Sequence, residues 1–152
     1  MGTRWKRIKA VRTIIKRDEH ELEVEKSDME RALHLLRKHE DEEFLAQEEL
    51  KDVERSMREC IDEDGSLSLH ALQRWRRYLP EARRKHRQAA TTRQRSATAV
   101  EQTTRVVVRR KAGLRAAEKL GDRLVRERRV DEERQIGKDN DADWLARWRR
   151  SE

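Results

Sequence analysis

Residues 59–72 read ECIDEDGSLSLHAL, and this stretch determines whether the chain continues as one helix or reverses its direction. Its acidic residues interrupt the apolar pattern found on either side. Gly65 permits a left-handed backbone, and Ser66 or Ser68 can cap the N-terminus of a following helix. We therefore predict a turn at residues 62–67 that joins two helices.

The acidic part of this stretch also resembles the second half of a calcium-binding EF-hand loop. With Gly65 at loop position 6, Asp62 and Asp64 occupy ligand positions 3 and 5. Cys60 and Ala71 occupy positions 1 and 12, where an acidic ligand and a bidentate glutamate are needed. These two replacements disfavour calcium binding, and we predict no metal site.

The composition favours long helices over a globular core. Of the 152 residues, 45% are charged and 34% are hydrophobic, and only one is proline. Such a composition indicates either disorder or long helices that share a narrow seam, and the scarcity of proline favours helices. No apolar run approaches the roughly 18 residues of a membrane-spanning helix, and we find no secretory signal. Lone Cys60 fits a reducing compartment, so we expect a cytoplasmic protein.

Apolar residues at steps of seven predict one long helix over about residues 4–61. The main series, which only Glu43 interrupts, comprises Ile8, Ile15, Leu22, Met29, Leu36, Leu50 and Met57. A companion series three residues further on comprises Val11, Ala32, Ala46, Val53 and Cys60, with the polar members Asp18, Glu25 and His39.

The same spacing predicts a second helix over about residues 68–136. Its main series comprises Leu72, Leu79, Val100, Val107 and Leu114, and its companion series comprises Ala82, Ala89, Ala117 and Leu124. Pro80 removes a backbone donor and is expected to bend this helix. Residues 88–104 contain few large apolar side chains, so packing is expected to be weakest there.

The two predicted helices carry opposite charge. Residues 18–64 have 7 basic and 19 acidic side chains, whereas residues 65–130 have 19 basic and 5 acidic ones. Many pairs can select the partner and the register, although each exposed pair contributes only about 0.3 to 0.5 kcal/mol. We therefore predict an all-α fold, a long antiparallel two-helix coiled-coil hairpin over residues 1–136, in which facing residue numbers sum to about 131. The isolated chain is expected to be a monomer, with residues 137–152 as a tail.

The end of this hairpin that bears both termini is predicted to be strongly positive. Residues 1–17 carry seven basic and no acidic side chains, and folding back brings them near a second basic segment. A surface of this kind attracts an acidic partner. The candidate partner-binding residues are Arg4, Lys6, Arg7, Lys9, Arg12, Arg123, Arg126, Arg128 and Arg129.

The segment RWRRYLP, residues 74–80, is the candidate binding site at the turn end. It combines Trp75 and Tyr78 with arginines, the residue types that dominate interface hot spots. On this reading Trp75 and Tyr78 project from one side of the helix, and Arg74, Trp75, Tyr78 and Leu79 contact a partner. Two alternatives remain, because Trp75 could close the hairpin seam and the aromatic and arginine groups could stack on nucleic acid bases.

The C-terminal tail contains a third candidate surface. After Gly137, the residues Trp144, Leu145 and Trp148 share one face of a short amphipathic helix. This face could dock on a partner, pack back on the hairpin or lie at a membrane surface, and its shortness favours partner docking. Without a partner we expect the tail to be disordered.

No arrangement of residues typical of catalysis is found. The five histidines are scattered, and His34 and His39 are five residues apart rather than the four that place two ligands on one helical face. There is no glycine-rich phosphate loop, and a narrow two-helix seam offers no substrate cavity. We expect a non-enzyme without a cofactor or a small-molecule substrate.

The order of these segments resembles a known family. A basic start, a long acidic heptad helix, the stretch GSLSLHALQRWRRY at 65–78 and a basic second helix are similar to the FliJ/YscO family of type III secretion stalk proteins. Arg74, Trp75 and Tyr78 resemble the entry to the second helix in flagellar members. Pro80 departs from the flagellar pattern, and the high arginine content is more similar to injectisome members.

This resemblance implies a central stalk. In the family, the end that bears both termini enters the central hole of the hexameric export ATPase, and the other end reaches toward the export gate ring. Related proteins also bind export chaperones. For this chain the resemblance implies a cytoplasmic protein, peripherally associated with the secretion apparatus at the inner membrane and without direct membrane insertion.

Two other classes of function stay open. A basic coiled coil could bind nucleic acid through residues 105–129, but the acidic first helix disfavours this, because it would neutralise the second helix before a phosphate could. A structural scaffold built from a dimeric coiled coil is the remaining alternative.

Overall fold

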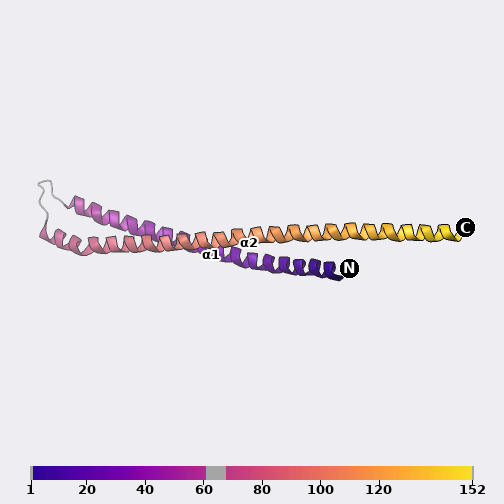
Figure 1. The fold of residues 1–152 in the computed structure, drawn as a ribbon. Coiled ribbons are helices and arrows are strands. Elements are labelled where there is room, and N and C mark those ends of the chain that lie inside the picture. The colour runs from indigo at the N-terminus through magenta and orange to yellow at the C-terminus, as the bar shows by residue number, and fades with distance from the viewer. Residues whose placement is uncertain (1, 61–67, 152) are drawn as a thin grey trace. The chain divides into compact units, whose positions relative to one another are not determined.

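Two helices account for nearly all of the described chain. The computed structural model describes residues 2–60 and 68–151, in which α1 spans Gly2–Glu59 and α2 spans Leu69–Ser151 (Figure 1). The two helices pack against each other, which confirms the predicted all-α hairpin. The predicted turn at residues 62–67, with the EF-hand-like acidic residues, lies outside the described residues.

The start of α2 follows the predicted capping chemistry. The Ser68 side-chain Oγ accepts a hydrogen bond from the Ala71 amide at 3.1 Å, and the Ser68 carbonyl accepts one from the Leu72 amide at 3.0 Å. A serine in this position satisfies an amide that has no partner within the helix. The prediction that Ser68 can cap the second helix is confirmed.

Contacts divide the chain into two units, Met1–Val24 with Val108–Glu152, and Glu25–Val107. In the second unit, Lys85 Nζ lies 3.2 Å from Glu49 Oε1. In the first unit, the Cβ position of Gly121 faces Val11. Each unit is therefore an antiparallel pair of helical segments, and the facing residue numbers sum to 134 for Glu49 and Lys85 and to 132 for Val11 and Gly121, against the predicted value of about 131.

The buried face of α1 is the predicted one. Ile8, Val11 and Leu22 are buried, and the later members of both heptad series are mostly half-buried. Met57, the last member of the main series, is exposed, so its predicted place in the seam is wrong, and Cys60 of the companion series is also exposed. Figure 1 shows the helices separating toward the end of α1 and the start of α2, which explains the loss of burial.

The buried face of α2 agrees with the prediction from Leu79 onward. Ala82 and Val107 are buried, as expected for members of the two series. Leu72, the first predicted member, is exposed, and Trp75 is buried instead. The reason is that Trp75 lies seven residues before Ala82 and therefore belongs to the companion series, where its large side chain fills the seam.

Polar side chains within the seam of the unit Glu25–Val107 meet each other rather than apolar groups. Arg93 Nε is buried and lies 2.5 Å from Glu43 Oε2, and His39 Nδ1 lies 2.5 Å from the buried Ser96 Oγ. A polar residue in a coiled-coil core is costly unless it faces its partner, so such pairs specify one register. Glu43 and His39 interrupt the apolar pattern of α1, and their contacts with Arg93 and Ser96 align α1 with α2.

The other unit contains a similar polar contact. Arg110 lies 2.8 Å from Glu21 and 3.9 Å from Asp18, whose side chain is largely buried. Asp18 is one of the polar members of the predicted companion series. An acidic residue on α1 therefore faces a basic residue on α2 in each unit. These contacts agree with the opposite net charges of the two helices.

The threonine-rich middle of α2, residues 88–104, is helical throughout. The hydroxyl groups of Thr91, Thr92 and Thr98 donate hydrogen bonds to carbonyls four residues earlier, at 2.9 to 3.1 Å. These bonds satisfy the hydroxyl groups without a partner from α1. Pro80 also lies inside the continuous helix.

The prediction that the second helix ends near residue 136 is wrong, because α2 continues to Ser151. A glycine inside a helix costs only about 1 kcal/mol relative to alanine, which the flanking residues can offset. Gln135 donates a side-chain hydrogen bond to Asp139 at 2.9 Å across Gly137. Figure 1 shows this yellow part of α2 running past the N-terminal end of α1.

Replacing Gly121 with alanine is expected to stabilise the protein. An added Cβ would lie 3.4 Å from Val11 Cγ1 and 3.7 Å from Ile15 Cδ1, which are ordinary packing distances. The helical preference of alanine should raise the free energy of unfolding by about 1 kcal/mol, and the new contacts should add to it. Urea unfolding followed by circular dichroism measures this change.

Gly113→Ala is the matched control, because nothing lies within 4 Å of its added Cβ. It should gain the helical preference alone. A Gly121→Ala protein that is less stable than the natural chain would contradict the close packing of α1 on α2 at this position.

Candidate partner-binding surfaces

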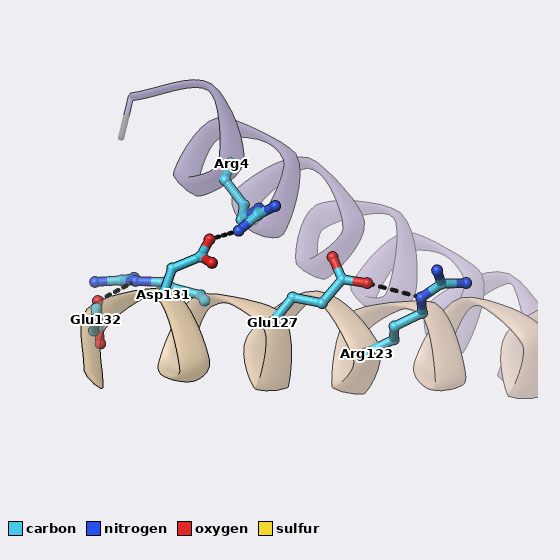
Figure 2. A network of polar contacts seen from close by, with 6 residues as sticks. Arg4, Arg123, Glu127, Asp131 and Glu132 are labelled. Atoms are coloured by element: carbon cyan, nitrogen blue, oxygen red, sulfur yellow. Dashed lines mark hydrogen bonds and ion pairs between the residues drawn. The ribbon is translucent and has the colours of Figure 1, made fainter. Parts of the chain in front are cut away.

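The end of the first unit that bears residue 2 holds most of the predicted docking residues. Arg4 forms an ion pair with Asp131, and Arg123 Nε lies 2.9 Å from Glu127 Oε1 (Figure 2). Arg128 Nε lies 2.6 Å from Glu132. These acidic residues of α2 form ion pairs with three of the predicted docking residues, so the positive charge at this end is smaller than the sequence suggested.

Trp5 is a feature of this end that sequence reasoning missed. Its ring lies 4.6 Å from Arg128 Cζ and 5.2 Å from Lys9 Nζ, measured to the ring centroid, so it forms cation–π contacts with both helices. The available signal was a tryptophan four residues before a lysine in a basic segment. Trp5 therefore fixes the α2 residue Arg128 against the start of α1.

An open pocket of about 550 Å³ lies beside this tryptophan. Its lining combines the backbone of the first residues with the charged pair Arg4 and Asp131 and with Arg128. Arg4 and Arg128 in this lining are paired with Asp131 and Glu132, whereas Arg7, which also lines the pocket, forms no ion pair among the described residues.

Five of the predicted docking residues at this end are exposed and take no part in the ion pairs and cation–π contacts described above. Among the residues that the structure describes, they form no ion pair and no hydrogen bond through their side chains. They are Lys6, Arg7, Arg12, Arg126 and Arg129. These cations, and not the paired arginines, are available to an acidic partner.

The predicted site at residues 74–79 is divided by the structure. Trp75 is only 7% exposed and faces α1, whereas Tyr78 is 54% exposed. Arg74 is exposed and Leu79 is half-buried. Trp75 and Tyr78 line one groove, as expected for residues three apart, but Trp75 is buried, so the alternative that Trp75 closes the seam is correct. The cause is the heptad register, which places residues 75 and 79 inward and residue 78 outward.

A groove of about 570 Å³ lies beside these residues, in the unit Glu25–Val107. Its apolar lining includes Leu45, Val53, Trp75 and Tyr78, and three acidic residues line its α1 side. The acidic residues are Glu48, Glu49 and Asp52. We call this feature the acidic groove. It exists because the two helices separate here and expose the edge of the seam.

The predicted tail surface is part of α2. Trp144 is 64% exposed and Leu145 is 46% exposed, and Trp148 is also exposed. Every residue from 133 to 150 is exposed. The segment is helical in this single chain, so the expectation that it is disordered without a partner is not met.

No group of three or more metal-ligating side chains occurs in the described ranges 2–60 and 68–151. Neither described helix contains a stretch long and apolar enough to cross a membrane. Comparisons with protein-family models, curated proteins and solved structures find no match to this chain.

Proposed function

We propose that the protein is a central stalk component of a type III secretion system, flagellar or injectisome, that links the export ATPase ring to the export gate. The proposal is supported by the helical hairpin and by the resemblance of its segments to the FliJ/YscO family. In this role the protein performs no chemistry and needs no cofactor. It transmits a mechanical or positional signal between two partners at the cytoplasmic side of the inner membrane.

The observation that carries the proposal is the group of exposed cations at the end that bears residue 2. Lys6, Arg7 and Arg12 of α1 lie in the same unit as Arg126 and Arg129 of α2. Several like charges on one surface raise the local potential and accelerate association with an acidic surface. This end would enter the central hole of the hexameric ATPase.

The acidic groove and the exposed residues Arg74 and Tyr78 belong to the other unit, which would face the export gate ring. Trp75 is buried in the seam and lines the same groove as Tyr78. Export chaperones are a further class of partner for this surface. No small-molecule substrate is involved.

Reversing charge at the exposed cations tests the proposal. In the triple variant Lys6→Glu, Arg7→Glu and Arg126→Glu, the affinity for the purified export ATPase should fall at least tenfold, because three attractive contacts become repulsive. The measurement is surface-immobilised binding at physiological salt. These residues form no internal ion pair among the described residues, so circular dichroism should show unchanged helicity.

The control carries the same number of reversals in the unit Glu25–Val107, at Arg77, Arg95 and Arg105, which are exposed. It should bind the ATPase as the natural chain does. Undiminished binding by the first variant would remove the proposed docking end, and an equal loss in the control would show attraction to overall charge alone.

Nucleic acid binding is the second candidate, and one observation favours it. In the unit Glu25–Val107, α2 presents exposed arginines on the side away from α1 that form no ion pair among the described residues: Arg77, Arg87, Arg95 and Arg105. Arg84 on this side is different, because its hydrogen bonds to Glu81 at 2.6 and 3.1 Å occupy it and lower the pKa of that carboxyl. The acidic residues of α1 are therefore not placed to neutralise the whole stripe.

A salt titration with random-sequence DNA separates this candidate from the stalk. Binding through several phosphates requires an affinity that falls linearly with salt on logarithmic axes. The stalk proposal expects no measurable affinity near physiological salt. Measurable binding there, lost in the Arg77, Arg95 and Arg105 variant, would favour the nucleic acid reading.

A further inference from the structure

The acidic groove has the properties of a site that receives a helix. Its floor is apolar and is formed by both helices, with Val53 from α1 and Trp75 and Tyr78 from α2. Leu45 at its edge is 66% exposed. Hydrophobic grooves between helices bind amphipathic helices through apolar residues spaced three or four apart.

The charge on the groove selects the occupant further. Glu48, Glu49 and Asp52 line the α1 side, and Arg74 is the basic residue in the lining. Glu48 contacts Lys51 at 3.0 Å, Asp52 contacts Arg55 at 3.4 Å and Glu49 contacts Lys85 of α2 at 3.2 Å, but all three are exposed pairs and are weak. The groove therefore favours a helix with arginine or lysine beside its apolar face.

The chain contains such a helix in its other unit. Trp144 and Leu145 are exposed on a part of α2 where every residue from 133 to 150 is exposed. At about 100° per residue, Arg147 and Arg149 border this apolar face on its two sides. Tryptophan and arginine are also the residues that contribute most to interface affinity.

We propose that the C-terminal segment of α2, residues 144–150, of one copy of the chain docks in the acidic groove of a second copy. Trp144 and Leu145 cover the apolar floor beside Trp75 and Tyr78. One bordering arginine, Arg147 or Arg149, meets Glu48 and Asp52. In this contact the acidic groove and the exposed C-terminal face are each other's binding partner.

The contact is heterologous, because each copy contributes a different surface. A pair of copies therefore leaves one groove and one C-terminal segment unused, and further copies can add until a ring closes or a chain forms. The fold of each hairpin needs a single chain, which was the basis for expecting a monomer. The association concerns surfaces that the hairpin does not cover; it does not involve the proposed ATPase-docking cations, but it would compete with a gate or chaperone partner for the acidic groove.

The association should be weak and concentration-dependent. A short helix with a few apolar anchors buries less than the roughly 1,200 Å² of a stable interface, so we expect a Kd on the order of 10 µM. Sedimentation velocity of the full-length chain measures it. The mean mass should rise across a concentration series that brackets this value, and a chain that stays monomeric at about 20 times this concentration overturns the proposal.

A complementation experiment tests the pairing of the two surfaces. The tail variant carries Trp144→Ala and Leu145→Ala, and the groove variant carries Glu48→Lys and Asp52→Lys. Each variant alone should be monomeric. An equimolar mixture should form a one-to-one dimer and nothing larger, because it restores one intact tail and one intact groove. A mixture that stays monomeric, or a variant that still self-associates, overturns the assignment.

Charge exchange supplies the specific readout. Arg147→Glu with Arg149→Glu should abolish association, and combining these two changes with Glu48→Lys and Asp52→Lys in one chain should restore it, because every tail and every groove then carries the exchanged charge. Glu40→Lys, at an exposed residue outside the groove with no ion pair among the described residues, is the control and should leave association unchanged. None of these residues enters the test of ATPase binding, so the two proposals fail separately.

Discussion

Trp75→Ala is expected to lower the free energy of unfolding by about 3 kcal/mol. The indole is 93% removed from solvent in a seam that contains few other large side chains, and its loss leaves a cavity that the rigid helices cannot close. Urea unfolding followed by circular dichroism at full length measures the change. The midpoint should fall, and the slope of the transition should stay the same if the loss is in stability alone.

Tyr78→Ala is the matched control three residues away. Its side chain is 54% exposed, so the same truncation should cost less than about 1 kcal/mol. Equal stabilities for the two variants would contradict the burial of Trp75. The comparison also separates the two interpretations of the RWRRYLP segment, since a partner anchor would affect binding and leave stability nearly unchanged.

Arg93→Leu is expected to cost about 2 kcal/mol, because it leaves the carboxylate of Glu43 within the seam without its partner. The side chains of Arg93 and Glu43 are 36% and 23% exposed, so the cost is smaller than for a fully buried pair. Glu43→Leu should cost a similar amount for the opposite reason. The double variant should be at least as stable as the natural chain, because two leucines continue the apolar seam.

The four proteins form a double-mutant cycle, and their unfolding free energies give the coupling directly. A coupling energy near zero would show that Glu43 and Arg93 do not face each other. That result would also contradict the alignment of α1 with α2 in the structure, since this contact and the one between His39 and Ser96 align the same stretch of the two helices.

The repeat of apolar residues was sufficient to predict which face of each helix is buried. Ile8, Leu22, Ala82 and Val107 all lie where steps of seven place them. The predicted register is approximate, because the facing pairs Glu49–Lys85, His39–Ser96 and Glu43–Arg93 have residue numbers that sum to 134, 135 and 136 rather than to about 131. Trp75 was placed wrongly because a tryptophan among arginines is equally typical of an interface and of a seam, and only the facing helix distinguishes them.

The candidate surfaces were less predictable than the fold. The basic residues were identified correctly by type, but those paired with Glu127, Asp131 and Glu132 could not be distinguished from the exposed ones. An ion pair depends on the rotation of both helices about their axes, which composition does not specify. The acidic groove was absent from the sequence analysis for the same reason, because it is lined by residues that are distant along the chain.

By itself, the sequence determined that this chain forms two long antiparallel helices, because heptad spacing and opposite charge act over many residues and their small contributions add. Only the tertiary structure decided which polar side chains meet across the seam, where the seam ends and that α2 continues past Gly137 to Ser151. These features depend on single contacts within a few ångströms. Each contributes no more than a few kcal/mol to the stability of the fold, and a single contact leaves no periodic pattern in the sequence.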